Sequence, residues 1–288
     1  MKVSRNVSSL LFLLLSLFAI AMSATAPIAL ALAGTITEYP LPFNKEGESN
    51  RPYIITTGSD GNLWFTDFYT NKIGRITLTG TYKAFKIPTK NSEPYGIAAG
   101  SDVNLWFTEQ VGNKIGRITT RGKITEFPIP TTNSGPLNVT PGPDGNLWFT
   151  EESGNKIGRI TTSGSITEFP VPSTSLGITA GPDGNLWFTM FYHNMIGRIT
   201  PAGVVTSFTM NKCGTDAICG PLGITTGPNG NLWFTLHDDA AVEQITTSGS
   251  FVSGFRTGSG PEGITVGPDG NLWFTDLGSF SVGRFVAS

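Results

Sequence analysis

All six tryptophans of the chain stand in one repeated pentapeptide, Asn-Leu-Trp-Phe-Thr. They are Trp64, Trp106, Trp148, Trp187, Trp233 and Trp273, at spacings of 42, 42, 39, 46 and 40 residues. A repeat of about forty residues with a fixed aromatic motif is typical of a β-propeller, in which each repeat forms one four-stranded blade. The sequence therefore predicts an all-β fold, a β-propeller with six four-stranded blades.

One repeat shows how a blade is laid out. Residues 176–180 form a short apolar strand, and the turn sequence Gly-Pro-Asp-Gly-Asn separates it from a second strand at 186–189. A third strand is predicted near 195–200 and a fourth near 204–208. The second strand is continuously apolar because both faces of a propeller blade press against neighbouring blades.

The first strand-like segment resembles a fourth strand rather than a first one. Residues 34–42 match residues 122–130 and 164–172 in the pattern Gly-x-Ile-Thr-Glu followed by an aromatic residue and proline. The chain ends, near Val286, after a third strand. We therefore expect the N-terminal segment to supply the outer strand of the last blade, which closes the ring and removes an open sheet edge.

Residues 1–33 have the features of an export signal. Lys2 and Arg5 precede an apolar stretch at 10–22, and the small-residue sequence Ala-Leu-Ala at 31–33 lies directly before the first strand. The alternative is an uncleaved membrane anchor, which Pro27 and interspersed polar residues disfavour. The prediction is a signal peptide at 1–33, a single propeller domain at 34–288, and a secreted or extracytoplasmic location.

Net charge and cysteine content limit the kinds of binding partner that we expect. With 19 basic and 21 acidic residues, the chain lacks an electrostatic footprint for nucleic acid. We expect a monomer with no membrane span after signal removal, and a small-molecule or peptide-like ligand at the channel mouth. Cys213 and Cys219 lie in the enlarged connection behind the 46-residue spacing, where an exported protein is expected to form a disulfide; a zinc site is the alternative.

Repetition separates packing residues from candidate site residues. The tryptophan, the Asp-Gly turn and the arginine of Ile-Gly-Arg recur around the ring, so blade packing explains them without a ligand. We expect the site where blades differ, and we expect the position after Trp-Phe-Thr to open toward the mouth. In chain order this position holds Asp67, Glu109, Glu151, Met190, Leu236 and Asp276.

In a closed ring the four acidic positions form one arc across blades six, one, two and three. Their carboxylates are able to hold a hard cation; the alternative is that they pair with lysine and arginine of the loops. The other two blades carry Met190, His193 and His237, which we expect to contact substrate on the apolar and aromatic side of the mouth.

The repeated Gly-Pro-Asp-Gly-Asn-Leu-Trp-Phe-Thr-Glu, followed by Asn-Lys-Ile-Gly-Arg-Ile-Thr, resembles the streptogramin B lyases, also called virginiamycin B lyases. The resemblance covers residues 34–288. It implies an enzyme that opens the ring ester of a cyclic depsipeptide by elimination, with Mg²⁺ as cofactor. The lyases of this family have seven blades, whereas this chain yields six.

The resemblance also implies site residues. Glu93 and Glu109 match the spacing of the two metal-binding glutamates of the family. Tyr95 stands at the position of the catalytic histidine, and Tyr53, one blade earlier, stands at the position of the second histidine. Tyrosine has a reference pKa of about 10, which is far from the near-neutral value that suits a general base; the other interpretation of both tyrosines is that they line the channel.

Two functions remain open from the sequence. The first is a secreted, Mg²⁺-dependent carbon–oxygen lyase that acts on an ester-bearing cyclic depsipeptide or a related substrate. The second is a noncatalytic propeller that binds a peptide or glycan at the channel mouth. The Glu93 and Glu109 pair favours the first, and the missing histidines favour the second.

Overall fold

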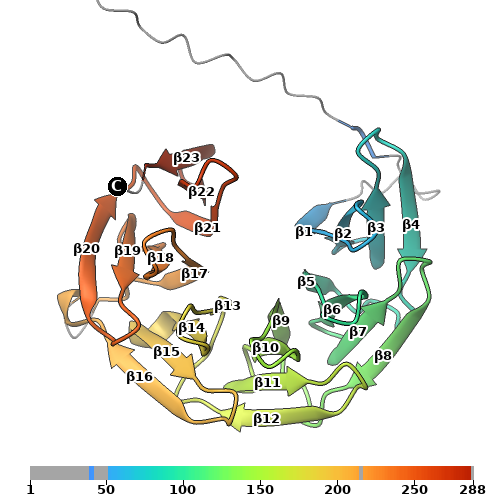
Figure 1. Cartoon of the computed structure of the whole chain (residues 1–288), viewed down its shortest axis with the longest axis horizontal. Coiled ribbons are helices and arrows are strands. Elements are labelled where there is room, and N and C mark those ends of the chain that lie inside the picture. Colours follow the sequence, from blue (N-terminus) through green and yellow to red (C-terminus); the bar gives the residue numbers. More distant parts are fainter. Residues whose placement is uncertain (1–38, 42–50, 214–216, 287–288) are drawn as a thin grey trace, which may run out of the picture. The chain divides into compact units, whose positions relative to one another are not determined.

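Each repeat folds into one antiparallel sheet, and the six sheets follow one another in an arc (Figure 1). The computed structural model describes residues 39–41, 51–213 and 217–286. The chain divides into two compact units, Met1–Pro40 and Leu41–Ser288, and the strands lie in the second. The predicted all-β propeller with six blades is confirmed, and the two helical turns of the described residues are the 3-10 turns η1 (Phe191–His193) and η2 (Asn211–Cys213).

Four strands succeed one another from the inside of a blade to its outside. The innermost strands are β1 (Pro52–Thr57), β5 (Pro94–Ala99), β9 (Pro136–Pro141), β13 (Ile178–Ala180), β17 (Pro221–Thr226) and β21 (Pro261–Val266). The second strands are β2 (Leu63–Asp67), β6 (Leu105–Glu109), β10 (Leu147–Glu151), β14 (Leu186–Met190), β18 (Leu232–Leu236) and β22 (Leu272–Asp276). The third strands are β3 (Lys72–Ile76), β7 (Lys114–Ile118), β11 (Lys156–Ile160), β15 (Met195–Ile199), β19 (Ala241–Ile245) and β23 (Ser281–Phe285). The outermost strands are β4 (Tyr82–Lys86), β8 (Ile124–Pro128), β12 (Ile166–Pro170), β16 (Val205–Thr209) and β20 (Phe251–Arg256).

The sixth sheet has three strands, β21, β22 and β23, in the part of the chain that the structure describes. The segment expected to complete it, residues 34–42, lies mostly outside the described residues. Its pairing with β23 therefore stays a prediction, as do the export signal at 1–33 and the location that follows from it.

The repeated residues are accounted for by packing, as predicted. In blade three, the Trp148 ring stacks on Phe169 at 5.5 Å, and the Arg159 guanidinium lies 5.6 Å from the Trp148 ring centre. The Trp148 indole donates to Asp144 at 3.0 Å, and Arg159 donates to the Pro201 carbonyl of the next blade at 2.9 Å. Stacking and cation–π contacts add to apolar burial, so the motif holds one blade together and ties it to its neighbour.

A threonine hydroxyl locks each blade to the following one. Thr66 accepts a hydrogen bond from Ile54 N within blade one and donates to the Tyr95 carbonyl of blade two, at 3.2 and 2.7 Å. The same donation to the next innermost strand occurs from Thr108 to Leu137, Thr150 to Leu176, Thr189 to Leu222 and Thr235 to Glu262. These five threonines are fully buried, so the hydroxyls fix where each innermost strand lies.

The two ends of the arc differ from the expected closed ring. Innermost strands of successive blades pack together from β1 to β21, but no comparable packing joins β21 to β1 among the described residues. On the last blade, Val282 is 64% exposed, whereas its counterpart Ile73 in blade one is fully buried. On the first blade, Tyr82 stacks on Phe65 at 6.1 Å and covers the face that would meet blade six. The expected adjacency of Asp276 and Asp67 is therefore not observed.

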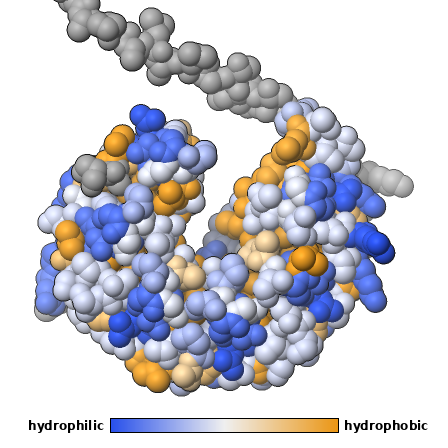
Figure 2. Space-filling view, viewed as in Figure 1, coloured by the Kyte–Doolittle hydropathy of each residue, from blue (hydrophilic) through white to orange (hydrophobic). Residues whose placement is uncertain are grey.

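Hydrophobic surface is exposed on the two end blades as well as at scattered places along the arc (Figure 2). The exposed hydrophobic side chains include Tyr53 and Ile55 on blade one and Leu277, Phe280 and Val282 on blade six. Over the described ranges, no helix is both long and apolar enough to cross a membrane.

The enlarged connection between blades four and five is fastened to blade four. Cys219 is buried and disulfide-bonded, and its backbone N donates to the Asn194 side chain at 2.8 Å. Asn194 in turn donates to the Ala217 carbonyl at 2.6 Å. The side chain of Cys213 lies outside the described residues, so the Cys213–Cys219 pairing stays a prediction.

Candidate functional site

The innermost strands line a central cavity of about 410 Å³. Its polar lining includes Tyr53, Tyr95, Asn138 and Glu262, and the rest is largely aliphatic side chain and glycine backbone. The second residue of each innermost segment occupies an equivalent position, because the threonine locks set the strands in the same way in successive blades. A concave, mostly apolar cavity with a few converging polar groups is the usual form of a small-molecule site.

Tyr53 and Tyr95 come together as a hydroxyl pair. The Tyr53 hydroxyl donates to that of Tyr95 at 3.1 Å, and the ring centres are 4.6 Å apart. Phe68 lies 6.2 Å from the Tyr53 ring and supports it from blade one. Because Tyr95 accepts from Tyr53, its own hydroxyl proton is left to donate to a ligand.

The environment of Tyr95 keeps that proton in place. Burial raises the pKa of the Tyr95 hydroxyl well above its usual value, and the negative charges of Glu262 and Glu152 raise it further. Tyr95 is therefore suited to donate a hydrogen bond rather than to remove a proton. Tyr95 stands at the position that the family resemblance gives to the catalytic histidine, but its raised pKa does not suit a general base.

The position directly after Trp-Phe-Thr does not open to the mouth, which corrects the prediction made from the repeat. Its six occupants are buried, with exposed fractions of 0 to 4%: Asp67, Glu109, Glu151, Met190, Leu236 and Asp276. Side chains alternate along a strand, so this residue shares a face with the leucine and phenylalanine of the motif, which pack between blades. Met190 accordingly lies in the core between blades three and four.

Glu109 and Glu151 occupy equivalent buried sites in blades two and three. Neither carboxyl oxygen of either residue has a hydrogen-bond partner among the described residues. Burial raises the pKa of the Glu109 carboxyl to about 8, and the negative charge of Glu126 adds to this shift. Glu151 shows the same rise, to about 8, from burial and from Glu168. Glu109 and Glu151 are thus buried and neutral at pH 7 when no cation is bound, and all four acidic positions are buried rather than exposed in an arc.

Glu93 lies beside Glu109. Pro94 pairs with Glu109 across the sheet, and Gln110 N donates to the Glu93 carbonyl at 3.1 Å. Glu93 is partly exposed and has a positive φ of 52°. Within the described residues, no group of three histidine, cysteine or carboxylate side chains is placed to hold a metal ion. In blade three, Gly135 stands at the position that corresponds to Glu93, so the pair occurs in blade two and not in blade three.

The two histidines lie away from the tyrosine pair. His193 is exposed on η1 and contacts the Ser173 hydroxyl at 2.6 Å, while His237 contacts Asp238 at 2.9 Å. Neither belongs to the lining of the central cavity. The structure therefore does not bring them, or Met190, together with Tyr53 and Tyr95.

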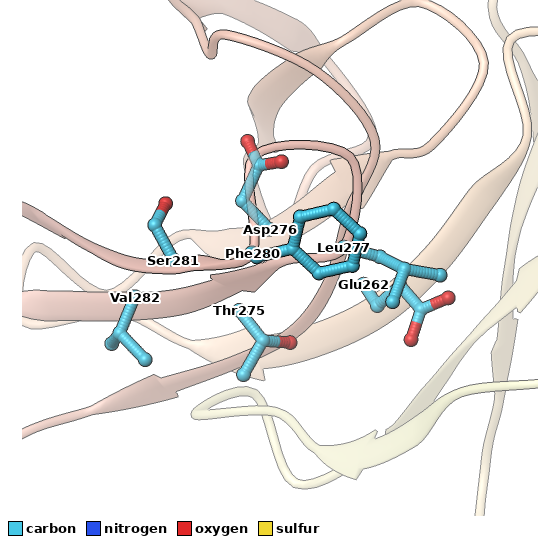
Figure 3. A pocket seen from close by; sticks show the side chains of 7 residues that line it. All are labelled: Glu262, Thr275, Asp276, Leu277, Phe280, Ser281 and Val282. Atoms are coloured by element: carbon cyan, nitrogen blue, oxygen red, sulfur yellow. The ribbon is translucent and has the colours of Figure 1, made fainter.

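Sequence reasoning missed Glu262. This residue lines the central cavity and also a second cavity of about 260 Å³ on the open face of blade six (Figure 3). The signal was present in the repeat, because the equivalent innermost positions read Tyr53, Tyr95, Leu137, Leu176, Leu222 and Glu262. Glu262 is the charged member of that series.

The fold is a β-propeller whose innermost strands line a cavity of a size compatible with a small ligand. A profile of the Virginiamycin B lyase family matches the chain in two overlapping segments, residues 19–215 and 173–288. A virginiamycin B lyase from Staphylococcus aureus is 40% identical, with a TM-score of 0.77 over 82% of this chain and 81% of that one. The chain belongs to the virginiamycin B lyase family.

Two further solved structures agree with this assignment. A catalytically inactive variant of the Staphylococcus aureus enzyme, crystallised with quinupristin, is 40% identical, with a TM-score of 0.78 over 83% of this chain and 82% of that one. A streptogramin B lyase is 33% identical, with a TM-score of 0.76 over 84% of each chain.

Proposed function

We propose that the protein is a carbon–oxygen lyase that opens an ester-bearing cyclic depsipeptide, or a related ester, by elimination. The observation that carries the proposal is the Tyr53–Tyr95 hydroxyl pair, which lies in the central cavity at the positions that the family resemblance gives to histidines. Family membership at 40% identity supports the reaction class. We also propose that the protein is exported, on the strength of residues 1–33.

In this elimination a base removes the proton α to a carbonyl, a carbon–carbon double bond forms, and the ester carboxylate leaves as the carbon–oxygen bond breaks. Negative charge develops on the carbonyl oxygen. A protonated Tyr95 hydroxyl, oriented by Tyr53, is suited to donate a hydrogen bond to that oxygen. The lining around the pair is largely apolar strand surface.

Mg²⁺ is part of the proposal. Glu93 and Glu109 would hold it. Glu93 directly precedes Pro94, which pairs with Glu109 across the sheet, and the buried Glu109 oxygens have no hydrogen-bond partner among the described residues, so a cation could be their partner. When bound, the ion would act as a Lewis acid toward the developing negative charge.

The lyase activity is tested with quinupristin as the substrate. Elimination opens the ring without adding water, so the product should elute differently in chromatography but keep the mass of the substrate. A product heavier by one water would show hydrolysis instead. An intact substrate would contradict the lyase proposal and leave ligand binding as the function of the cavity.

Replacing Tyr95 with phenylalanine should lower kcat by about 10²- to 10³-fold, because removal of one positioned donor to a developing oxyanion has that effect. Quinupristin affinity should change little, since the ring remains. Steady-state kinetics and a binding titration measure the two quantities. Full activity of Tyr95→Phe would show that the hydroxyl has no part in turnover.

Mg²⁺ should stabilise the folded protein, by about 2.7 kcal/mol at a concentration one hundred times its Kd, because the ion binds the folded state only. Glu93→Gln and Glu109→Gln should abolish the rise in Tm. Glu151→Gln is the matched control, since Glu151 has the same buried surroundings without a counterpart of Glu93. Thermal scans with EDTA or Mg²⁺ measure the effect, and equal loss of the response in all three variants would contradict the assigned pair.

A further inference from the structure

Glu262 holds the position in blade six that Tyr53 and Tyr95 hold in blades one and two. The Thr235 hydroxyl donates to its carbonyl at 2.7 Å. Gly223 packs directly against the same carbonyl, because a Cβ at Gly223 would lie 2.3 Å from that oxygen. The backbone of Glu262 is thus fixed from blade five, while its side chain lines the central cavity.

The Glu262 carboxylate is not neutralised by a neighbour. Among the described residues it forms no ion pair, and the cavity lining holds no lysine, arginine or histidine. Glu262 lines the same cavity as Tyr53 and Tyr95. A partly exposed, unpaired carboxylate beside a hydroxyl pair can accept a proton from a bound molecule.

We propose that Glu262 is the general base that removes the α-proton of the ester substrate. This inference rests on the lyase function proposed above. The carboxylate takes the proton from the α-carbon, the electrons of that bond form the carbon–carbon double bond, and the carbon–oxygen bond breaks to release the ester carboxylate. The Tyr95 hydroxyl holds the carbonyl oxygen through the same step, so no further reactant is required.

The position of Glu262 also suits a substrate larger than the central cavity. It borders the second cavity, of about 260 Å³, which Leu277, Phe280 and Val282 line with apolar surface (Figure 3). In this arrangement the apolar side chains of a cyclic depsipeptide would pack against Leu277, Phe280 and Val282, and its ester would lie between Glu262 and the two tyrosines.

The test compares wild type, Glu262→Gln, Glu262→Asp and Glu152→Gln on quinupristin. Glu152 is the matched control: it is also a partly exposed glutamate, but it accepts a hydrogen bond from Gln110 at 3.3 Å and does not line the cavity. Glu262→Gln should lower kcat by about 10²- to 10⁴-fold, the usual contribution of a positioned base. Its affinity for quinupristin should stay within about threefold, since a neutral amide of the same shape remains.

Three further readouts separate a base from a structural role. Formate added to Glu262→Gln should restore part of the activity. Glu262→Asp should retain more activity than Glu262→Gln. In the pH profile of kcat/KM, the fall on the acidic side should disappear in Glu262→Gln. Circular dichroism checks the fold of each variant. If wild type turns over quinupristin, full activity of Glu262→Gln overturns the assignment of Glu262 as the base. Loss of activity in Glu152→Gln as well would also overturn it. Both outcomes leave the lyase function standing. No turnover by wild type overturns the lyase function and this inference together.

Discussion

Replacing Trp148 with alanine should lower the free energy of unfolding by about 3 to 5 kcal/mol, the cost of truncating a large core aromatic. Trp148 is fully buried, stacks on Phe169 and carries the Arg159 guanidinium on its face. All of these contacts are lost together, and the cavity left behind cannot collapse because it lies between two rigid sheets. Denaturant unfolding monitored by circular dichroism gives the value.

The same change at Trp273 is the internal control. This tryptophan occupies the equivalent position on the open face of blade six and is only partly buried. We expect Trp273→Ala to cost less than half as much as Trp148→Ala, because less apolar area returns to water on unfolding. Equal costs would show that the open face is covered in solution.

Raising the pH should destabilise the protein through Glu151. Its pKa is about 8 in the folded state and 4.5 as the ordinary value, so between these limits the folded state keeps a proton that the unfolded state releases. The stabilisation is complete below pH 4.5 and is lost as the pH rises through 8. By the usual conversion of a pKa shift into free energy, the loss is on the order of 3 to 5 kcal/mol.

Glu151→Gln should flatten this dependence, because the amide stays neutral throughout the range. Denaturant unfolding in EDTA at pH 5, 6, 7, 8 and 9 measures the slope, with Glu152→Gln as the control because its carboxylate is partly exposed. Glu109 has an equivalent shift, so the single variant should remove about half of the dependence. Identical slopes in wild type and Glu151→Gln would contradict the buried-acid interpretation.

The strand order within each blade could be predicted because each repeat contains the local turn and strand signals that determine it. The turn after each first strand and the apolar second strand fixed the order of strands in every blade, and β14, β15 and β16 begin and end within two residues of the expected ranges. Six repeats of the same pattern leave little room for another fold.

The site was predicted less well, because it depends on which way single side chains point. Glu109 and Met190 were expected at the mouth, but they follow the leucine and phenylalanine of the motif at intervals of two and so face the neighbouring blade. Tyr53 and Tyr95 were placed correctly in the channel, as the alternative interpretation of both residues had it. Their mutual hydrogen bond depends on the distance between blades one and two, which no local pattern contains.

The threonine hydrogen bonds hold the innermost strands in place independently of the side chains that these strands present to the channel. Each lock engages the carbonyl of the innermost position and makes no use of the side chain there, so tyrosine, leucine and glutamate are all held in the same way. A substitution at one of these five held positions can therefore alter what the channel binds while the backbone geometry stays the same. Propellers built on this repeat can diversify their ligands one residue at a time, with each blade contributing an independently variable group.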